Sequence, residues 1–311
     1  MTAHPKLAAL AARCAGLPPL PTAVVHPCDG PSLEGAMQAA GAGLIAPVLV
    51  GPPARIHAAA AAARLDISAV PLIETPHSHA SAERAVALVR EGGAAALMKG
   101  SLHTDELMGA VVAKEGGLRT GRRLSHVFVM DVPTYAKLLL ITDAAVNILP
   151  SLEDKADIVA NAIDLAQALG VARPKVAILS AVETVTGKIP STIEAAALCK
   201  MADRGQIQGG LLDGPLAFDN AISREAARTK GIVSEVAGDA DILLVPDMEA
   251  GNMLAKTLTF LGGADSGGVV MGARVPIILT SRADSVEARL ASCAVAVLDA
   301  AARAAHAKLA G

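Results

Sequence analysis

Aromatic side chains are almost absent from this chain. Its 311 residues include one Tyr, three Phe and no Trp. Proteins that bind single-stranded nucleic acids stack bases on aromatic rings. The net charge of −3 also supplies no overall positive field to attract a polyanion. We therefore expect no nucleic-acid partner, and a core built from aliphatic side chains.

Cysteine is scarce as well. The four cysteines are scattered, at Cys14, Cys28, Cys199 and Cys293. Their spacing matches neither a metal site nor the disulfide framework of a small secreted domain. We expect small structural residues at these positions, and no metal site.

Long hydrophobic runs without a break are also missing. The N-terminus lacks a signal-peptide pattern, because Lys6 and Arg13 interrupt its Ala-rich segment. The longest uncharged run, Gly35–Ala54, contains glycines and prolines that predict a helix end, a turn and a strand instead of a membrane span. These features predict a soluble, cytoplasmic protein with no membrane partner.

What the sequence does contain is a regular alternation of short aliphatic segments and longer Ala-rich helical patterns. This alternation predicts βα units and mostly parallel sheets with helices on both faces. The expected strands are 23–25, 47–50, 95–98, 126–130, 138–142, 175–180, 209–213, 242–246, 268–272 and 276–280. The expected helices are 32–40, 55–65, 81–91, 104–112, 152–169, 192–204, 220–230, 249–261 and 285–309.

Two of these helices begin with capping signals. Ser191 and Glu194 have the spacing of a capping box, in which each side chain satisfies a backbone donor of the other residue. Asp284 and Glu287 have the same spacing, with Asp284 in the capping position. Capping is therefore a structural role that competes with any chemical role of these two carboxylates.

Polar side chains collect at five turns that are expected to follow strands. These turns are 98–104, 180–184, 213–215, 246–252 and 281–282. The carboxyl ends of parallel strands lie at one edge of a sheet, so we expect the turns to converge on one cleft. The last turn adds hydroxyl groups, Arg282 and a helix N-terminus, whose unpaired N–H groups carry partial positive charge. That turn predicts a site for a small anion such as phosphate.

A series of motifs runs from about Leu97 to the C-terminus. In order they are Met98-Lys-Gly with His103-Thr104, Thr142-Asp-Ala-Ala-Val-Asn-Ile148, Pro174-Lys-Val-Ala-Ile-Leu-Ser180, Asp213-Gly-Pro-Leu216, Val236-Ala-Gly-Asp-Ala-Asp-Ile-Leu-Leu-Val-Pro-Asp247, Gly251-Asn252 and Thr280-Ser-Arg-Ala-Asp284. Together they resemble the phosphate acyltransferases, the family of phosphate acetyl- and butyryltransferases. The last motif, with Leu118-Arg-Thr-Gly-Arg122, is more similar to the butyryltransferase branch.

The resemblance implies direct transfer of a short-chain acyl group between coenzyme A and inorganic phosphate in a ternary complex. Coenzyme A is then a substrate, and no cofactor is needed. The implied fold is α/β: a two-domain, three-layer α/β/α sandwich like that of isocitrate- and isopropylmalate-dehydrogenase-type enzymes, with the active site in the interdomain cleft. We expect one domain from residues 1–130 and 275–311, to which the C-terminal helix returns, and a second from residues 131–274. A homodimer or larger homo-oligomer is also implied.

On this interpretation the catalytic candidates are Ser281, Arg282, Asp284 and Glu287. Arg282 suits the phosphate or the developing oxyanion, and Ser281 can donate a hydrogen bond to the same region. Fixed donors aimed at such a charge are worth about 3–4 kcal/mol each. The candidates for substrate binding are Lys99, His103, Thr104, Arg122, Asp247, Asn252 and Thr280. For His103, Thr104, Asp247 and Asn252, helix capping or another structural contact is the competing interpretation.

The identity of the general base stays open. In the acetyltransferase branch an Asp commonly lies seven residues after the motif serine, and here that position is Ala288. Glu287 is adjacent, but a shift of one residue turns a side chain by about 100° around a helix. Asp284 is close in sequence, and deprotonation by the substrate itself is an alternative.

Two other function classes are compatible with parts of the sequence. One is a non-catalytic protein that senses acyl-CoA, which the alanine at the expected base position would allow. The other is a dehydrogenase of the related isocitrate type. The chain has no dinucleotide-binding fingerprint and no obvious cluster of metal-binding aspartates, so the sequence disfavours a dehydrogenase.

Overall fold

The computed structural model describes residues 4–279 and 284–310. Candidates Thr280, Ser281 and Arg282 therefore lie outside the described residues. The chain divides into two compact units, which are described separately. The N-terminal unit comprises residues 9–122 and 267–311, and the middle unit comprises residues 1–8 and 123–266. The predicted domain division, after residues 130 and 274, stays a prediction.

The N-terminal unit is built on parallel strands. Its strand order is β3-β2-β1-β4-β11-β10, and all neighbours are parallel except β10 and β11. These strands are β1 (Leu20–Val25), β2 (Ile45–Gly51), β3 (Leu72–Glu74), β4 (Ala96–Lys99), β10 (Asp265–Met271) and β11 (Ile277–Ile278). The helices are α2 (Gly30–Gly41), α3 (Pro53–Ala63), α4 (Ser78–Arg90), α5 (Thr104–Val112) and α11 (Val286–Ala310), while α1 (Pro5–Arg13) crosses the boundary between the units.

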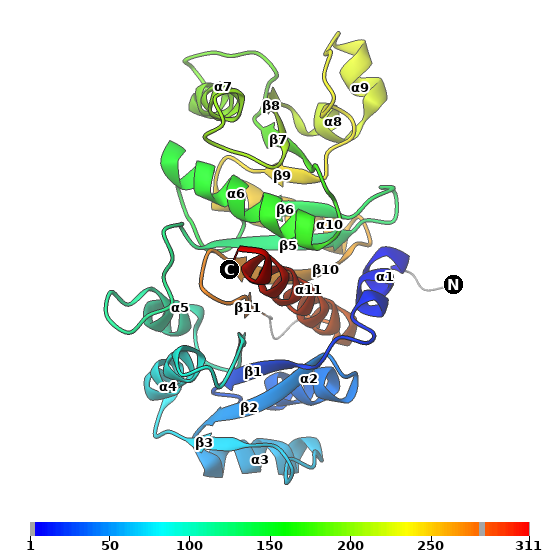
Figure 1. Ribbon diagram of the computed structural model, residues 1–311. Helices are drawn as coiled ribbons and strands as arrows, with labels where there is room; N and C mark the ends of the chain where they lie inside the picture. Colours follow the sequence, from blue (N-terminus) through cyan, green and yellow to red (C-terminus); the bar gives the residue numbers. More distant parts are fainter. Residues whose placement is uncertain (1–3, 280–283, 311) are drawn as a thin grey trace. The chain divides into compact units, whose positions relative to one another are not determined.

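Helices cover the strands of this unit: α4 packs against β1 and β2, and α2 packs against β2 (Figure 1). The segment Val286–Lys308 of α11 is long and apolar enough to span a membrane, but half of it is buried inside the structure. This helix packs against α2 and β11. Packing within the unit therefore accounts for its apolar composition.

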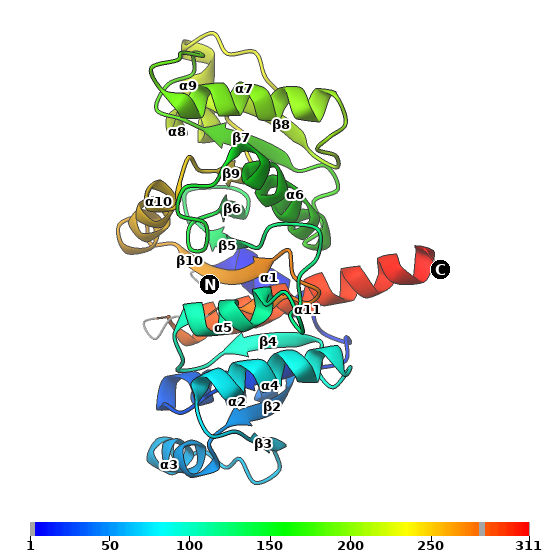
Figure 2. The same ribbon diagram turned by 90° about the vertical axis from the view of Figure 1, so that its left-hand side faces the viewer.

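The middle unit has the strand order β5-β6-β9-β7-β8, in which only β5 and β6 are antiparallel. Its strands are β5 (Ser125–Asp131), β6 (Leu139–Thr142), β7 (Lys175–Leu179), β8 (Leu211–Leu216) and β9 (Ile242–Leu244). Its helices are α6 (Leu152–Ala168), α7 (Pro190–Asp203), α8 (Phe218–Ile222), α9 (Arg224–Thr229) and α10 (Met248–Phe260). α6 and α10 lie on opposite faces of this sheet (Figure 2). The α/β class and mostly parallel strands are thus confirmed.

The first residues of the chain are tied to the middle unit by hydrogen bonds. The backbone N–H groups of Lys6 and Leu7 donate to Asp131 Oδ2 over 2.8 and 3.1 Å. Lys6 Nζ donates to the carbonyls of Val132 and Tyr135 over 2.8 and 2.6 Å. These contacts explain why residues 1–8 belong to the middle unit.

Several sequence predictions of local structure are wrong. The single helix expected at 220–230 is two short helices, because Ser223 ends α8 and its Oγ accepts the Ala226 N–H to begin α9. The strand expected at 276–280 is only the two-residue β11. Strand β3 and helix α1 were not predicted.

The capping box predicted for Ser191 and Glu194 is also wrong. Helix α7 begins at Pro190, and Ser191 Oγ instead hydrogen-bonds Ser180 Oγ over 2.9 Å. Glu194 forms an ion pair with the buried Lys155. At α11 the Oγ of Ser285, one residue after Asp284, accepts the Ala288 N–H over 3.0 Å. Tertiary partners therefore displace the expected cap of α7. At α11 Ser285 accepts one N–H group, and the pairing of Asp284 with Glu287 stays a prediction.

Candidate active site

The turn after β4 in the N-terminal unit carries three predicted substrate-binding residues: Lys99, His103 and Thr104. This turn is pressed against the end of β1, where Gly100 N donates to Val25 O over 2.9 Å. A Cβ on Gly100 would lie 2.3 Å from Val25 O and 2.7 Å from the His26 carbonyl carbon. Only glycine therefore allows this close approach of two backbone segments.

Ser101 ties the same turn to His26. The His26 carbonyl accepts hydrogen bonds from Cys28 N over 2.8 Å, from Ser101 N over 3.0 Å and from Ser101 Oγ over 2.8 Å. Ser101 Oγ in turn accepts from Cys28 N over 3.2 Å. One carbonyl at the end of β1 thus joins the turns that follow β1 and β4.

Glu106 fixes the other end of this turn. Its Oε2 accepts the His103 N–H over 2.8 Å, and His103, not Thr104, occupies the capping position of α5. Its Oε1 accepts from Ser78 Oγ over 2.6 Å and pairs with His79 Nδ1 over 3.1 Å. The Ser78 hydrogen bond is the main cause that lowers the pKa of Glu106. Glu106 therefore stays ionised and connects the starts of α4 and α5.

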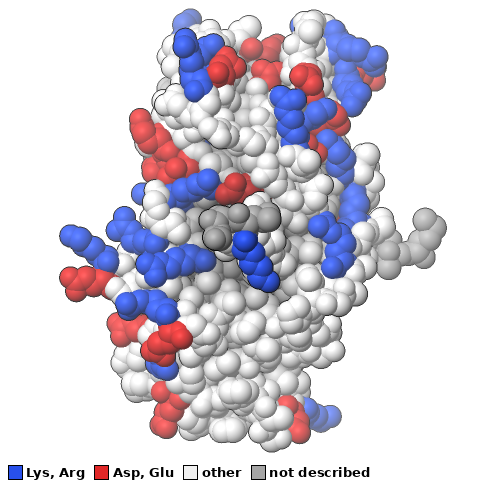
Figure 3. All heavy atoms as spheres, in the orientation of Figure 1, with Lys and Arg blue, Asp and Glu red and all other residues white. Residues whose placement is uncertain are grey.

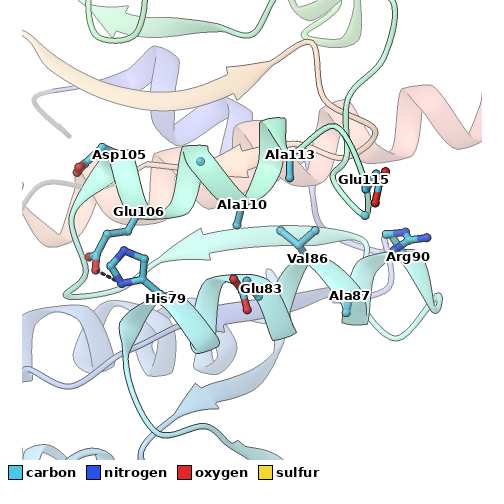
Figure 4. Close-up of a pocket in the computed structure, with 12 residues that line it drawn as sticks. His79, Glu83, Val86, Ala87, Arg90, Asp105, Glu106, Ala110, Ala113 and Glu115 are labelled. Carbon is cyan, nitrogen blue, oxygen red and sulfur yellow. Dashed lines mark ion pairs between the residues drawn. The ribbon is translucent and has the colours of Figure 1, made fainter.

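A groove of about 540 Å³ lies between α4 and α5 (Figure 4). Its lining is small and apolar along Val86, Ala87 and Ala110. The His79–Glu106 pair lies at one end and Arg90 at the other. Lys99, His103 and Thr104 do not line it. The groove is thus a neighbour of the candidate turn, not part of it.

Arg122 lies in the exposed loop that follows α5. Its backbone N–H donates to Thr120 Oγ1 over 3.1 Å, and that hydroxyl donates to Gly272 O over 2.6 Å. Lys114 and Arg119 are exposed in the same region. Figure 3 shows Lys and Arg side chains gathered on the left, at the level of α5 and this loop in Figure 1. The loop therefore carries several positive charges, and the hydrogen bond from Thr120 to Gly272 anchors it.

The start of α11 carries the two carboxylates that were predicted as catalytic. Glu287 is exposed in the first helical turn, whereas the adjacent Ala288 is 6% exposed. Asp284 is partly buried and precedes Ser285, which caps the helix. Glu287 therefore lies on a different side of the helix from the position where the family pattern has its Asp.

In the middle unit, the predicted residues Asp247 and Asn252 make structural contacts. Asp247 caps α10, because its Oδ1 accepts the Ala250 N–H over 2.8 Å. Asn252 Nδ2 donates to Ala144 O over 3.2 Å. Nearby, a Cβ on Gly251 would lie 2.9 Å from the Ala144 Cβ. These contacts hold the start of α10 against the loop that follows β6.

That loop is organised by the buried carboxylate of Asp143, which is 2% exposed. Asp143 Oδ1 accepts the N–H groups of Ala145 and Val146 over 2.9 and 3.1 Å. Its Oδ2 accepts from Asn147 N over 3.0 Å and from Asn147 Nδ2 over 2.5 Å. Asn147 Oδ1 then accepts from Arg123 Nε over 2.8 Å. Both carboxylate oxygens of Asp143 and the side-chain amide of Asn147 therefore have hydrogen-bond partners within this network.

His126 of β5 is buried near this network. Burial, partly offset by the charge of Asp143, lowers the pKa of His126 to about 4. Its Nδ1 makes no hydrogen bond within residues 4–279 and 284–310, and its ring lies edge-on to Phe128 with centroids 4.4 Å apart. His126 is therefore neutral in the folded chain near neutral pH.

The structure thus brings Lys99, His103 and Thr104 together in one turn of the N-terminal unit, and Asp247 and Asn252 together on α10 of the middle unit. Sequence reasoning did not single out His26 or Glu106. A polar residue directly after an expected strand was the available signal for His26. Nothing local marked Glu106, because its partners Ser78 and His79 lie on another helix.

Comparison with known proteins gives a consistent family assignment. A family model described as "Phosphate acetyl/butaryl transferase" matches residues 77–297. A phosphate acetyltransferase of Rhizobium meliloti is 68% identical over 285 residues, which cover 92% of this chain and 90% of that protein. A phosphate butyryltransferase of Clostridium acetobutylicum is 44% identical over 270 residues, which cover 87% of this chain and 90% of that protein.

Among solved structures, a branched-chain phosphotransacylase from Enterococcus faecalis V583 is similar to this chain, with a TM-score of 0.78 and 32% identity. The match covers 90% of this chain and 99% of that one.

Proposed function

Because this chain belongs to the phosphate acetyl/butyryl transferase family, we propose that it transfers an acetyl group between coenzyme A and inorganic phosphate. The observation that carries the choice of acyl group is the 68% identity to a phosphate acetyltransferase, against 44% to a phosphate butyryltransferase. The Thr280–Asp284 motif pointed instead to the butyryltransferase branch. The acyl chain length is therefore the part of the proposal that the experiment must decide.

The chemistry requires no group beyond the two substrates and the side chains. The thiolate of coenzyme A attacks the carbonyl carbon of acetyl phosphate, a C–S bond forms, and the C–O bond to phosphate breaks. The reverse reaction uses a phosphate oxygen as nucleophile and releases the thiolate. Negative charge grows on the carbonyl oxygen in both directions, so fixed hydrogen-bond donors there lower the barrier.

We assign these donors to Ser281 and Arg282. Arg282 offers a planar fork of N–H groups that suits phosphate, and Ser281 offers a neutral hydroxyl. The assignment rests on the family motif, and the turn at Lys99 and His103 is proposed to bind substrate on the same basis. Arg122 lies in a basic loop, and its charge suits a phosphate group of coenzyme A.

For the base that takes the thiol proton, we propose Asp284 ahead of Glu287. Glu287 is exposed on another side of α11 from the buried Ala288, whereas Asp284 is partly buried at the start of that helix. Asp284→Asn should lower kcat more than Glu287→Gln in the direction that consumes coenzyme A. Equal rates for the two variants would remove this distinction and leave deprotonation to the substrate.

The test of the proposed function is a thiol-release assay with acyl-CoA substrates from two to eight carbons, with and without phosphate. We expect phosphate-dependent release that is fastest with acetyl-CoA, and arsenate should replace phosphate. Faster release with butyryl-CoA would reassign the acyl group. No release with either anion would reject acyl transfer.

A second candidate, a non-catalytic sensor of acyl-CoA, is favoured by one observation. Ala288 is buried at the position where the family pattern has its Asp. Tight binding of acetyl-CoA without turnover at any chain length would support the sensor. We also propose that the chain acts in the cytoplasm, needs no cofactor and forms a homo-oligomer, as the family resemblance implies.

A further inference from the structure

His26, at the end of β1, has an unusual backbone conformation. Its φ is 54°, in the left-handed region that non-glycine residues uncommonly adopt. Within the described ranges Arg64 is the other non-glycine residue of this kind, with a φ of 56°, and it caps the C-terminus of α3, where this conformation is common. His26 caps no helix. Residues held in such uncommon backbone conformations cluster at functional sites, so the conformation of His26 indicates a functional role.

The side chain of His26 is held at both ring nitrogens. Its Nε2 lies 3.3 Å from Arg55 Nη1, and its Nδ1 lies 3.1 Å from Ser81 Oγ. A guanidinium can only donate, so Nε2 accepts and the ring proton is on Nδ1, directed to Ser81. Ser81 Oγ donates onward to His77 O over 2.9 Å. The neutral ring is therefore fixed in one orientation.

His26 cannot itself contact a substrate, because it is 3% exposed. Burial is the main cause that lowers its pKa, and the charge of Arg55 adds to this effect. What the residue does is connect other groups. Its carbonyl accepts the hydrogen bonds that fix Ser101, and its ring accepts a hydrogen bond from Arg55. His26 thus fixes the turn after β4, which carries Ser101, relative to the start of α3 after β2, which carries Arg55.

Arg55 carries a positive charge that no carboxylate pairs with in the described part of the chain, although Asp29 and Arg55 both act on the nearby Cys28 thiol. It is exposed in the first turn of α3, where the partial positive charge of the helix terminus disfavours a cation. Within residues 4–279 and 284–310, no carboxylate forms an ion pair with it, and its contact with the neutral His26 ring leaves other N–H groups available. The guanidinium lies beyond the carboxyl ends of parallel strands, where α/β proteins bind ligands. An anion bound there would pair with the Arg55 guanidinium and with the partial positive charge of the helix terminus.

We propose that Arg55 is a further substrate-binding residue that contacts a phosphate group, and that His26 is the positioning residue that orients Arg55 and holds the Lys99–Thr104 turn. The inference rests on the proposed function, which supplies two sources of that group: inorganic phosphate and the phosphates of coenzyme A. A hydrogen-bonding guanidinium suits either one.

The test compares Arg55→Ala, Arg55→Lys and His26→Asn in steady-state kinetics and in calorimetric binding of coenzyme A. Asn tolerates the left-handed conformation but is too short to reach Arg55. Arg55→Ala should raise the KM of one phosphate-bearing substrate about tenfold, which is about 1.4 kcal/mol, with kcat changed less than twofold. Arg55→Lys should recover part of this loss, and His26→Asn should raise the same KM about threefold.

Separate titrations of the substrates identify the source of the phosphate. A higher KM for inorganic phosphate alone would assign Arg55 to that substrate. A higher KM for coenzyme A, absent with 3′-dephospho-coenzyme A, would assign it to the 3′-phosphate; an increase that persists would assign it to the diphosphate. Arg64→Gly is the matched control, because it removes one charge from the other end of α3 at a position that suits glycine.

Unchanged KM values and affinities in Arg55→Ala would overturn the inference, as would an equal effect in Arg64→Gly. Arg55 is exposed, so this variant should fold even if His26→Asn does not. A wild-type chain that binds coenzyme A but releases no thiol would reject the proposed function alone. Calorimetry with coenzyme A and with inorganic phosphate would then still decide the role of Arg55.

Discussion

The carboxyl ends of the strands in the two units use their polar residues differently. In the middle unit, the carboxylates of Asp143 and Asp247 accept backbone N–H groups from the following few residues, and the Asn147 side chain bonds Asp143 and the adjoining chain at 123–124. In the N-terminal unit, Arg55 has a neutral histidine as its partner and no paired carboxylate among the described residues. Polar residues at this edge thus hold turns in both units, and in the N-terminal unit Arg55 also presents a positive charge there.

This difference shows why polar residues at strand ends are ambiguous in a sequence. A carboxylate there often finds backbone donors within a few residues, because loops and helix starts leave N–H groups unpaired. A guanidinium can only donate hydrogen bonds, so it cannot satisfy these unpaired backbone N–H groups. Substitutions at the carboxyl ends of the strands in the middle unit should therefore lower the stability of the fold. Substitutions of Arg55 should instead weaken the binding of substrate.

The largest expected effect comes from Asp143→Ala in the middle unit. It removes the acceptor of three backbone N–H groups and of the Asn147 side chain. Buried donors left unpaired cost about 1–3 kcal/mol each, so the free energy of unfolding should fall by about 3 kcal/mol or more. Urea unfolding measures this change. Arg55→Ala is the companion variant, and a loss of stability as large as that of Asp143→Ala would erase the contrast.

A smaller loss is expected from Gly100→Ala in the N-terminal unit. The added Cβ would meet the backbone of Val25 and His26 at 2.3–2.7 Å, and backbone atoms cannot rotate away. We expect a loss of about 2 kcal/mol together with a higher KM, because the Lys99–Thr104 turn must shift. Gly121→Ala is the control, since among the described residues other than its two chain neighbours no atom lies within 4 Å of its added Cβ. Equal behaviour of the two variants would show that the close approach is unimportant.

Acid should weaken the middle unit through His126. Its pKa is about 4 in the folded chain and about 6.5 when unfolded, so the unfolded state binds a proton first as the pH falls. The stabilisation present above pH 6.5 is therefore lost between pH 6.5 and about 4, by on the order of 2 kcal/mol. Urea unfolding at several pH values measures this slope. The same slope in His126→Gln would assign the loss to other groups.

The smallest expected effect is that of Asp247→Ala at the start of α10. This change removes one capping hydrogen bond, to Ala250 N, and should lower the free energy of unfolding by about 1 kcal/mol. Asp247→Ser should retain most of the stability, since serine also caps helices. If Asp247 binds substrate as well, both variants should raise a KM. A change in stability alone would restrict it to capping.

The fold was largely predictable, because buried strands such as β6 are continuous aliphatic segments and the helices between them have clear patterns. Local caps were less predictable. Ser191 has the spacing of a capping box, but Ser180, directly after β7, offers its hydroxyl another partner. Ser223 divides one predicted helix into two because it can end one and begin the next.

The candidate site was predictable only where a motif marked it. Lys99 and His103 lie in a turn that the sequence indicated. The importance of His26 depends on Arg55, Ser81 and Ser101, which are 29, 55 and 75 residues away along the chain. Its left-handed backbone has no signature in the sequence, since even histidine, which is enriched among non-glycine residues there, usually adopts other conformations. Contacts of this range become visible only in the structure.

The most direct measurement of the central claim follows phosphorus by ³¹P NMR while the chain acts on acetyl-CoA and inorganic phosphate. Acyl transfer predicts an acetyl phosphate signal that grows at the expense of inorganic phosphate, in step with thiol release, and that disappears on adding coenzyme A. Thiol release with an unchanged phosphate signal would show hydrolysis of the thioester and would contradict the proposed function.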